Sequence, residues 1–217
     1  MSSRDATRTA PEAVVVVFAR APVPGRVKTR LVPLLGKAGA ARLHAQLVER
    51  TMRTALAARC GPVELHCAPR PRHPFFERLA RRHGVRLRGQ GAGDLGARMR
   101  RAFERVLRTA GAAILVGSDC PALAPSDLRA ARRALRAGAD VVLAPAEDGG
   151  YALIALRRVR AAPFRGIEWG GPRVLAQTRR AIARLGWRCV ELRTLWDVDR
   201  PDDVARLRRS RRPGGRR

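Results

Sequence analysis

Basic side chains gather in a segment that follows the first apolar run of this 217-residue chain. The segment, residues 18–31 (FARAPVPGRVKTRL), carries Arg20, Lys28 and Arg30 around a bend at Gly25. Main-chain N–H groups near the glycine, with one ammonium and several guanidinium groups, would hold the phosphates of a nucleotide. Because the segment matches neither GxxxxGK[ST] nor GxGxxG, an ordinary surface loop is the alternative. Lys28 favours the phosphate site, since the chain has only two lysines and uses arginine elsewhere.

A single carboxylate follows the apolar run 112–116, in the segment 117–121 (GSDCP). A carboxylate at this position can hold Mg²⁺ or Mn²⁺ against phosphate oxygens and offset the charge that grows on a leaving group. We therefore expect Asp119 to bind a metal and to act in catalysis with Lys28. The alternative is that Asp119 only caps the turn. Cys120 has no histidine placed in the sequence to activate it, so we do not expect a thiol nucleophile.

An acidic and glycine-rich segment, residues 147–151 (EDGGY), follows the apolar run 141–144. Its carboxylates can accept hydrogen bonds from sugar hydroxyls, and paired glycines let the backbone approach a ligand closely. We expect a sugar or acceptor to bind here, with Asp148 orienting the acceptor, at residues Glu147, Asp148, Gly149, Gly150 and Tyr151. A hairpin turn with an acidic tip is the alternative.

Two further carboxylates alternate in the segment 196–203 (WDVDRPDD). In an extended backbone, Asp197 and Asp199 lie on the same face, so either of them could be a second metal ligand. The alternative is a cap between a strand and the helix that Pro201 begins.

Strands and helices alternate along the chain. The β-branched run 13–19 predicts a strand that is buried on both faces. Further strands are expected at 63–67, 85–87, 112–116, 141–144, 151–156 and 189–192. Helices are expected at 38–58, 75–82, 126–137 (capped by Ser126) and 172–185, in a segment that ends near 107, and from 201 onward. This order predicts an α/β fold with three αβα layers around a mainly parallel, doubly wound sheet.

The composition limits the possible partners. A net charge of +27 is compatible with nucleic-acid binding, but the arginines are spread over nearly every predicted helix and the few aromatic residues form no stacking pattern. We therefore expect no specific nucleic acid partner. No apolar run reaches the ~18 residues of a membrane span, and the first residues do not resemble a signal peptide. Four cysteines without a CxxC pair predict reduced thiols, and we expect a cytoplasmic protein with no membrane partner.

The terminal segments differ from the rest of the chain. Residues 1–12 are polar, and residues 208–217 hold six arginines with Pro and Gly. Both compositions predict disorder, which leaves residues 13–207 as a single domain.

Taken in order, these segments resemble the GT-A-fold nucleotide-diphospho-sugar transferase superfamily. Within it, the chain is most similar to a bacterial glycosyltransferase-like family labelled arsenosugar-biosynthesis glycosyltransferase or radical-SAM/selenodomain-associated transferase. The resemblance covers residues 13–207 and also includes 89–99 (GQGAGDLGARM), 145–156 and Glu168-Trp169.

The resemblance implies roles for further residues. Nucleotide binding would involve Gln90, which would read a base edge, together with Gly93, Asp94 and Arg98. Asp199 would be the second metal ligand beside Asp119, and the sugar or acceptor would also contact Glu168 and Trp169. Arg200 stands where relatives tend to have a capping threonine, which predicts a final helix that frays at its start.

These roles predict glycosyl transfer from a nucleotide sugar to a small-molecule acceptor, dependent on Mg²⁺ or Mn²⁺. The alternative is nucleotidyl transfer from a nucleoside triphosphate, with pyrophosphate as the second product. Ser118 favours this alternative, since many glycosyltransferases of this fold have DxD where the chain has a single aspartate. A basic nucleic-acid-binding protein is the remote third possibility.

Overall fold

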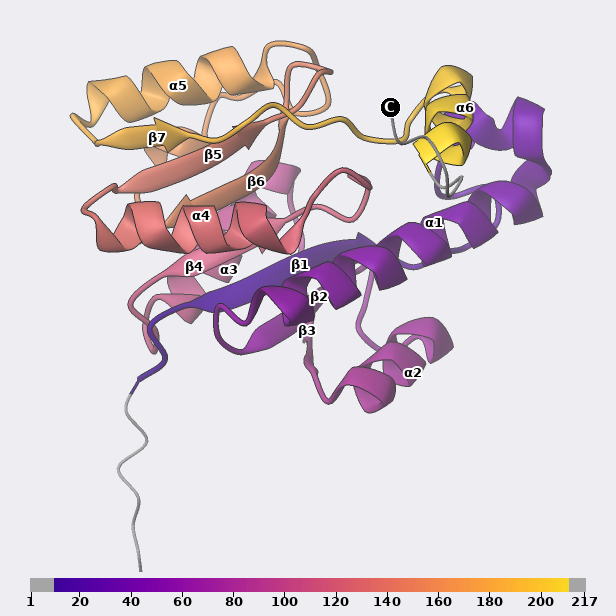
Figure 1. Ribbon diagram of the computed structural model, residues 1–217, viewed down its shortest axis with the longest axis horizontal. Helices are drawn as coiled ribbons and strands as arrows, with labels where there is room; N and C mark the ends of the chain where they lie inside the picture. Colours follow the sequence, from indigo (N-terminus) through magenta and orange to yellow (C-terminus); the bar gives the residue numbers. More distant parts are fainter. Residues whose placement is uncertain (1–9, 211–217) are drawn as a thin grey trace, which may run out of the picture.

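Seven strands form one sheet in the computed structural model of the protein, which describes residues 10–210 (Figure 1). Their order is β3-β2-β1-β4-β6-β5-β7. Only β6 runs antiparallel to its neighbours in this described region, and the other ladders are parallel. The strands are β1 (Val14–Arg20), β2 (Val63–Ala68), β3 (Arg86–Gly89), β4 (Ala113–Val116), β5 (Val141–Pro145), β6 (Tyr151–Leu156) and β7 (Cys189–Glu191). The predicted mainly parallel α/β fold is confirmed.

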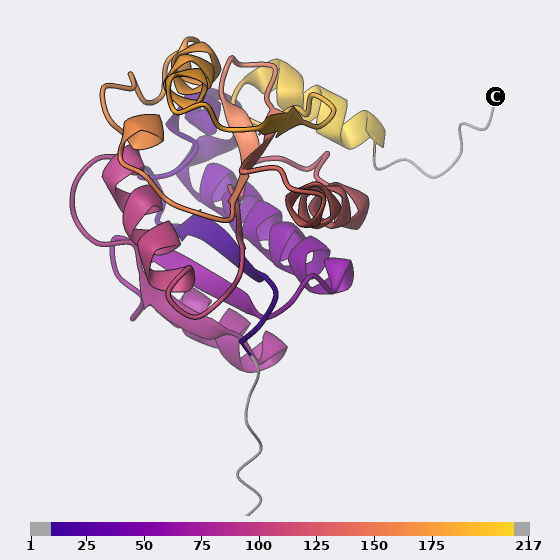
Figure 2. The ribbon, with the colours of Figure 1, turned by 90° about the vertical axis from the view of Figure 1, so that its left-hand side faces the viewer.

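Helices cover both faces of the sheet, so the three-layer arrangement is confirmed as well. One face packs against α1, α2 and α4, and the other against α3, α5 and η2. Figure 2 shows α1 and α4 on one side of the sheet and α3 with η2 on the other. The helices are α1 (Val32–Ala58), α2 (Pro74–His83), α3 (Leu95–Val106), α4 (Pro125–Arg136), α5 (Val174–Arg184) and α6 (Pro201–Ser210), with the short 3-10 helices η1 (Thr29–Leu31) and η2 (Ala162–Phe164).

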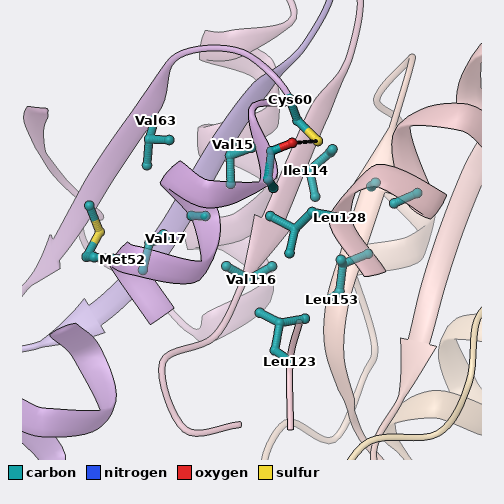
Figure 3. Packing of buried hydrophobic residues seen from close by; sticks show 14 of the residues in the cluster. Val15, Val17, Met52, Cys60, Val63, Ile114, Val116, Leu123, Leu128 and Leu153 are labelled. Atoms are coloured by element: carbon teal, nitrogen blue, oxygen red, sulfur yellow. Dashed lines mark hydrogen bonds between the residues drawn. The ribbon is translucent and has the colours of Figure 1, made fainter. Parts of the chain in front are cut away.

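The alternation of side chains along β1 supplies both cores. Val15 and Val17 point into the cluster under α1 and α4, which Figure 3 shows from close by, while Val14 and Val16 point into the cluster under α3. A strand between two helical layers therefore needs apolar residues at successive positions, and the run 13–19 has them. Within residues 10–210, the helices lack the combination of length and apolar content that a membrane span requires.

A third, smaller cluster joins two distant parts of the chain. Leu31 and Leu47 pack against Val198, Val204 and Leu207. Figure 1 accordingly shows α6 beside the beginning of α1. This packing brings the segment 196–203 to the loop 18–31, and the candidate site depends on it.

Several helix starts differ from those expected. α1 begins six residues early, across a kink at Gly36, where φ is 69°. Ser126 does not cap α4: Ala124 holds the cap position, and the Asp127 carboxylate accepts from the Ala124 N–H at 2.8 Å. α5 begins two residues after Pro172. An acidic side chain inside the first turn can thus replace a side chain at the cap itself.

The start of α6 uses the same device. Asp203 accepts hydrogen bonds from the N–H groups of Asp199 at 2.9 Å and Arg200 at 2.7 Å, so this helix has a cap despite Arg200. α6 also includes residues 208–210, so the boundary expected at 207 lies inside a helix. The rest of the two predicted terminal segments, 1–9 and 211–217, lies outside the described residues.

The connection between β5 and β6 docks closely on the segment before α5. Gly149 has φ +87°, and a Cβ there would lie 2.0 Å from the Pro172 carbonyl oxygen. The Leu175 N–H donates to the Gly149 carbonyl at 2.8 Å. Gly170 has a similar φ of +84°, but a Cβ there would meet no atom within 4 Å.

These two glycines make a matched pair for a stability test. Gly170→Ala should cost about 1 kcal/mol, because alanine is strained at positive φ. Gly149→Ala should cost about 3 kcal/mol or more, because steric overlap with Pro172 adds to the same strain. Denaturant unfolding of both variants measures the difference, and equal losses would show that the connection does not dock as described.

Candidate functional site

Lys28 lies at the end of the basic loop in an unusual conformation. Its backbone is left-handed, with φ 48° and ψ 43°, which costs a non-glycine residue about 1 kcal/mol or more. Its side chain is only 4% exposed, and Nζ lies 3.0 Å from Oδ1 of Asp119. A buried ammonium needs a partner of opposite charge, and the fold supplies one at the carboxyl end of β4.

Asp119 divides its carboxylate between the protein and the cleft. Oδ1 is enclosed and faces Lys28, while the side chain as a whole is 46% exposed. Burial alone would raise the pKa of Asp119, but Lys28 and then His44 outweigh it and lower this pKa to about 2. The group is therefore a permanent carboxylate at neutral pH, as a metal ligand must be.

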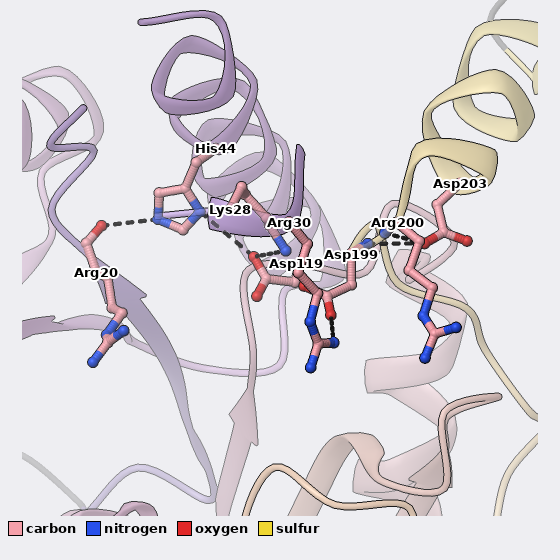
Figure 4. Close-up of polar contacts among 8 residues, drawn as sticks. All are labelled: Arg20, Lys28, Arg30, His44, Asp119, Asp199, Arg200 and Asp203. Carbon is pink, nitrogen blue, oxygen red and sulfur yellow. Dashed lines mark hydrogen bonds and ion pairs between the residues drawn. The ribbon is translucent and has the colours of Figure 1, made fainter. Parts of the chain in front are cut away.

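His44 completes this cluster, and sequence reasoning did not assign it a role. Its Nε2 lies 3.0 Å from the carbonyl oxygen of Arg20, and its Nδ1 lies 3.5 Å from Oδ1 of Asp119 (Figure 4). A carbonyl only accepts, so Nε2 carries a hydrogen and donates to it. The sequence contained a signal that His44 is buried: it stands at helical spacing from Leu47 and Thr51, which lie on the buried face of α1.

The C-terminal segment brings two aspartates to the same region, in different settings. Asp199 lies 2.5 Å from Nη1 of Arg30, in an ion pair between exposed side chains. Asp197 is half-buried, and its pKa rises to about 6 because of burial first and the neighbouring Asp148 second. Asp199 therefore has a cation beside it, whereas the carboxylates of Asp148 and Asp119 contribute to the raised pKa of Asp197.

Three cavities lie at or near the carboxyl edge of the sheet. The first, which we name the central cavity, has a volume of about 340 Å³. Three of the residues around it are Asp119, Asp148 and Asp197, and Tyr151 and Trp169 meet edge to face with ring centroids 6.5 Å apart. Most of its remaining wall is apolar. This cavity brings together predicted metal and acceptor residues.

The second, the acidic cavity, has a volume of about 430 Å³ and shares Asp148 and Asp197 with the central cavity. Arg30, Asp199 and Glu147 also line it. Glu147 is held by Arg206 of α6 through contacts of 2.7 and 3.1 Å, so its carboxylate is already paired.

The third, the arginine cavity, has a volume of about 280 Å³. Arg20, Arg26 and Arg98 line it together with Gly91. The arrangement places predicted nucleotide-binding arginines from the first loop and from α3 around one space. Guanidinium groups suit phosphate oxygens.

Several predicted contacts serve the scaffold instead. The Gln90 amide donates to the carbonyls of Ala19 at 3.2 Å and His66 at 2.9 Å, so its nitrogen braces β1 and β2 and is not free to read a base. Asp94 caps α3 by accepting from Ala97 N–H at 2.7 Å. The Gly93 carbonyl accepts from Arg98 Nε at 2.8 Å.

Gly25, Gly149 and Glu168 also lie outside the lining of the three cavities. Gly25 bends the loop with φ 76°, and a Cβ there would contact the Lys37 chain at 3.6 Å. Glu168 forms an exposed ion pair with Arg173 at 2.6 Å. Gly149 holds the docked turn, while Gly150 lines the central cavity and its N–H donates to Asp148 at 2.9 Å. The segment 147–151 therefore connects β5 and β6 as a turn, which was the alternative, and it also contributes to the wall of the central cavity.

Cys120 lines the central cavity, but its chemistry is that of a buried thiol. Burial raises the pKa of Cys120 to about 11. A thiol with this pKa is protonated at neutral pH and is a poor nucleophile, in agreement with the sequence prediction.

Among residues 10–210, no group of three or more His, Cys, Asp or Glu side chains has the spacing of a metal site. Asp119 and Asp197 are nevertheless two carboxylates that line the same cavity. Mg²⁺ is commonly held by one or two protein carboxylates, with substrate phosphates and water as the other ligands.

Solved structures with known names share this fold. A protein of Desulfovibrio desulfuricans G20 assigned as a nucleotide-diphospho-sugar transferase is 28% identical, with a TM-score of 0.85 over 94% of this chain and 89% of the other. CMP:2-keto-3-deoxy-manno-octonic acid synthetase in complex with CTP is 14% identical, with a TM-score of 0.60 over 92% and 98%. Glucosyl-3-phosphoglycerate synthase of Mycobacterium tuberculosis, with Mn²⁺ and UDP, is 12% identical, with a TM-score of 0.56 over 92% and 76%.

These neighbours establish the fold of nucleotide-diphospho-sugar transferases, and they include both nucleotide-sugar transferases and nucleotidyltransferases. Comparison with curated proteins finds no match. A family model described as "Uncharacterized protein conserved in bacteria (DUF2064)" matches residues 51–171, more than half of the chain. The protein therefore belongs to the DUF2064 family of bacterial proteins.

Proposed function

We propose that this protein transfers a glycosyl group from a nucleotide sugar to a small-molecule acceptor, with the help of a divalent metal ion. One observation carries the proposal: Lys28, Asp119 and Asp197 come from three distant segments and meet at the edge of the sheet where ligands bind. The 28% identity to a nucleotide-diphospho-sugar transferase over most of both chains supports it.

The carboxylates fit a hard cation such as Mg²⁺ or Mn²⁺. Asp119 and Asp197 line one cavity, and the charge of Asp119 contributes to the raised pKa of Asp197. Such a cation would hold the donor phosphates and offset the charge on the leaving group. We favour Asp197 over Asp199 as the second ligand, because Arg30 already pairs with Asp199.

The chain's own groups divide the remaining work. Arg20 and Arg98 would bind the donor in the arginine cavity, and Lys28 would place its charge on a phosphate oxygen. Asp148, which has only a main-chain N–H as a hydrogen-bond partner in the described residues, would accept the proton of the acceptor hydroxyl. The acceptor oxygen then bonds to the anomeric carbon, and the nucleoside diphosphate leaves with the electrons of the broken C–O bond.

Nucleotidyl transfer is the second candidate. One aspartate follows β4, and the residue before it is a buried serine rather than a second acid. In this reaction the acceptor oxygen bonds to the α-phosphorus, and pyrophosphate leaves. The two reactions differ in the nucleotide donor and in the phosphate product, so they can be separated directly.

We also propose that the protein works in the cytoplasm on dissolved substrates. Its four cysteines are free thiols in the described part of the chain. Thiols are maintained in a reducing compartment.

Asp119→Asn tests the metal role and the reaction together. The amide keeps the size of the side chain but loses its charge, so turnover should fall by about 10²-fold or more while the protein stays folded. The assay incubates the protein with Mg²⁺ and pools of nucleotide sugars or nucleoside triphosphates, with a mixture of alcohols as acceptors. Nucleoside diphosphate is the expected product, pyrophosphate would favour the second candidate, and unchanged turnover in the variant would remove Asp119 from the site.

Lys28→Arg is expected to lower kcat by about 10²-fold, more than it raises KM. The Lys28 side chain is only 4% exposed, so a wider guanidinium must displace its surroundings, and it also delivers its charge less locally. Lys37→Arg is the matched control, because Lys37 is exposed and makes the same change of residue type. If both variants keep near wild-type kinetics, the phosphate role passes to the arginines of the loop.

Asp197→Asn tests whether the folded protein disfavours the charged form of Asp197. Because the folded state raises the pKa of Asp197 to about 6, ionisation above that pH disfavours the folded protein, and asparagine does not ionise. The variant should therefore be more stable than wild type at pH 8, with a difference that shrinks toward pH 4. Denaturant unfolding in the presence of a chelator measures this, and a difference independent of pH would contradict it.

A further inference from the structure

The central cavity has an unusual composition for this protein. Lysine and arginine make up 45 of the 217 residues, and yet within residues 10–210 no basic side chain lines this cavity. The arginine cavity begins at Arg20, the last residue of β1. It has three arginines and no acidic residue among its described lining. The acidic cavity has Arg30 and Arg200 in its lining, so the central cavity differs from both of its neighbours in having no basic residue among its described lining.

The walls of the central cavity are mostly apolar and come from several elements. Phe18 of β1, Leu115 of β4 and Ile154 of β6 line it from the sheet, and Met99 and Val174 line it from α3 and α5. Phe18 and Met99 are less than a tenth exposed. Burying the apolar part of a ligand against such a surface stabilises the complex by about 25 cal/mol per Å².

The charged groups of this cavity are all negative. Asp119, Asp148 and Asp197 line it, and Lys28 faces the enclosed oxygen of Asp119 rather than lining the cavity. A phosphate or carboxylate on a ligand would be brought near these oxygens without a basic partner from the cavity wall. A cation held by Asp119 and Asp197 would be occupied by the donor phosphates, which leaves Asp148 to repel an anionic acceptor, so the cavity selects against a second anion.

We propose that the acceptor is an uncharged alcohol with a compact apolar body, and that the central cavity binds it. This inference rests on the proposed transfer reaction. The volume of about 340 Å³ is at the small end of ligand sites, so a compact molecule fits. The apolar walls hold the body, and the carboxylates are the acceptors to which its hydroxyl group donates a hydrogen bond.

The test compares the binding of benzyl alcohol, benzoate and glycerol to the full chain by ligand-observed NMR, with no nucleotide present. Benzyl alcohol should bind at least about tenfold more tightly than benzoate. The two ligands have the same ring, but only benzoate carries a negative charge, which the aspartates repel. It should also bind more tightly than glycerol, which has hydroxyl groups but no apolar body. Equal binding of benzyl alcohol and benzoate, or a preference for glycerol, would overturn the proposal.

A charge change at the rim locates the binding. Leu95 lines the central cavity and is 42% exposed, so Leu95→Arg should be tolerated by the fold. It should raise the affinity for benzoate by about tenfold, since the cavity gains a cation. Leu34→Arg is the control: Leu34 is also an exposed leucine, at 50%, and it lies outside the cavity, so benzoate affinity should not change. The proposal fails if the two variants behave alike.

The binding test and the transfer assay give separate results, so failure of this inference can be distinguished from failure of the proposed function. If the binding preference is absent while nucleotide turnover still depends on Asp119, the acceptor class is wrong and the proposed function stands. If the preference is present but no nucleotide donor is turned over, the cavity binds uncharged ligands in an enzyme of another class.

Discussion

The enclosed ion pair between Lys28 and Asp119 joins the two halves of the site. It links the basic loop after β1 to the end of β4, and Lys28 makes it from a strained, left-handed backbone conformation. A buried ammonium without its carboxylate would be costly, so this pair fixes where the loop can lie. The position of the loop then determines where a phosphate group and a metal ion could meet.

The small core between α1 and α6 positions two other acidic residues of the site, Asp197 and Asp199, in a similar way. Val198 is fully buried between Asp197 and Asp199, and this burial directs the alternate side chains toward the cleft. The Val198 N–H also donates to the Asp119 carbonyl at 2.9 Å, which ties the segment to the end of β4. Packing and hydrogen bonding therefore bring together carboxylates that are far apart in the sequence.

The sequence was sufficient to predict the sheet, because the β-branched run in β1 and the alternation of elements leave few other folds. It also led to the prediction that Lys28 and Asp119 act together, and the structure places their charged groups 3.0 Å apart. It could not separate Asp197 from Asp199, since their difference arises from Arg30, which is 169 residues away from Asp199. The family resemblance implied a base-reading role for Gln90, and the sequence alone could not show that its amide nitrogen donates to carbonyls of β1 and β2. His44 was missed because its partners come from other segments.

The distribution of charge connects the composition to the proposed chemistry. Six of the chain's 18 acidic residues line the central and acidic cavities, in a protein whose net charge is +27. The arginine-rich surface would attract a nucleotide, but these carboxylates would repel its phosphates if nothing neutralised them. Burial first and the neighbouring Asp148 second raise the pKa of Asp197 to about 6, and Lys28 offsets only part of this rise. Asp119, Asp199 and Glu147 have basic partners, whereas Asp148 and Asp197 form no ion pair among the described residues, and the cation that we propose to arrive with the substrate would offset their charge.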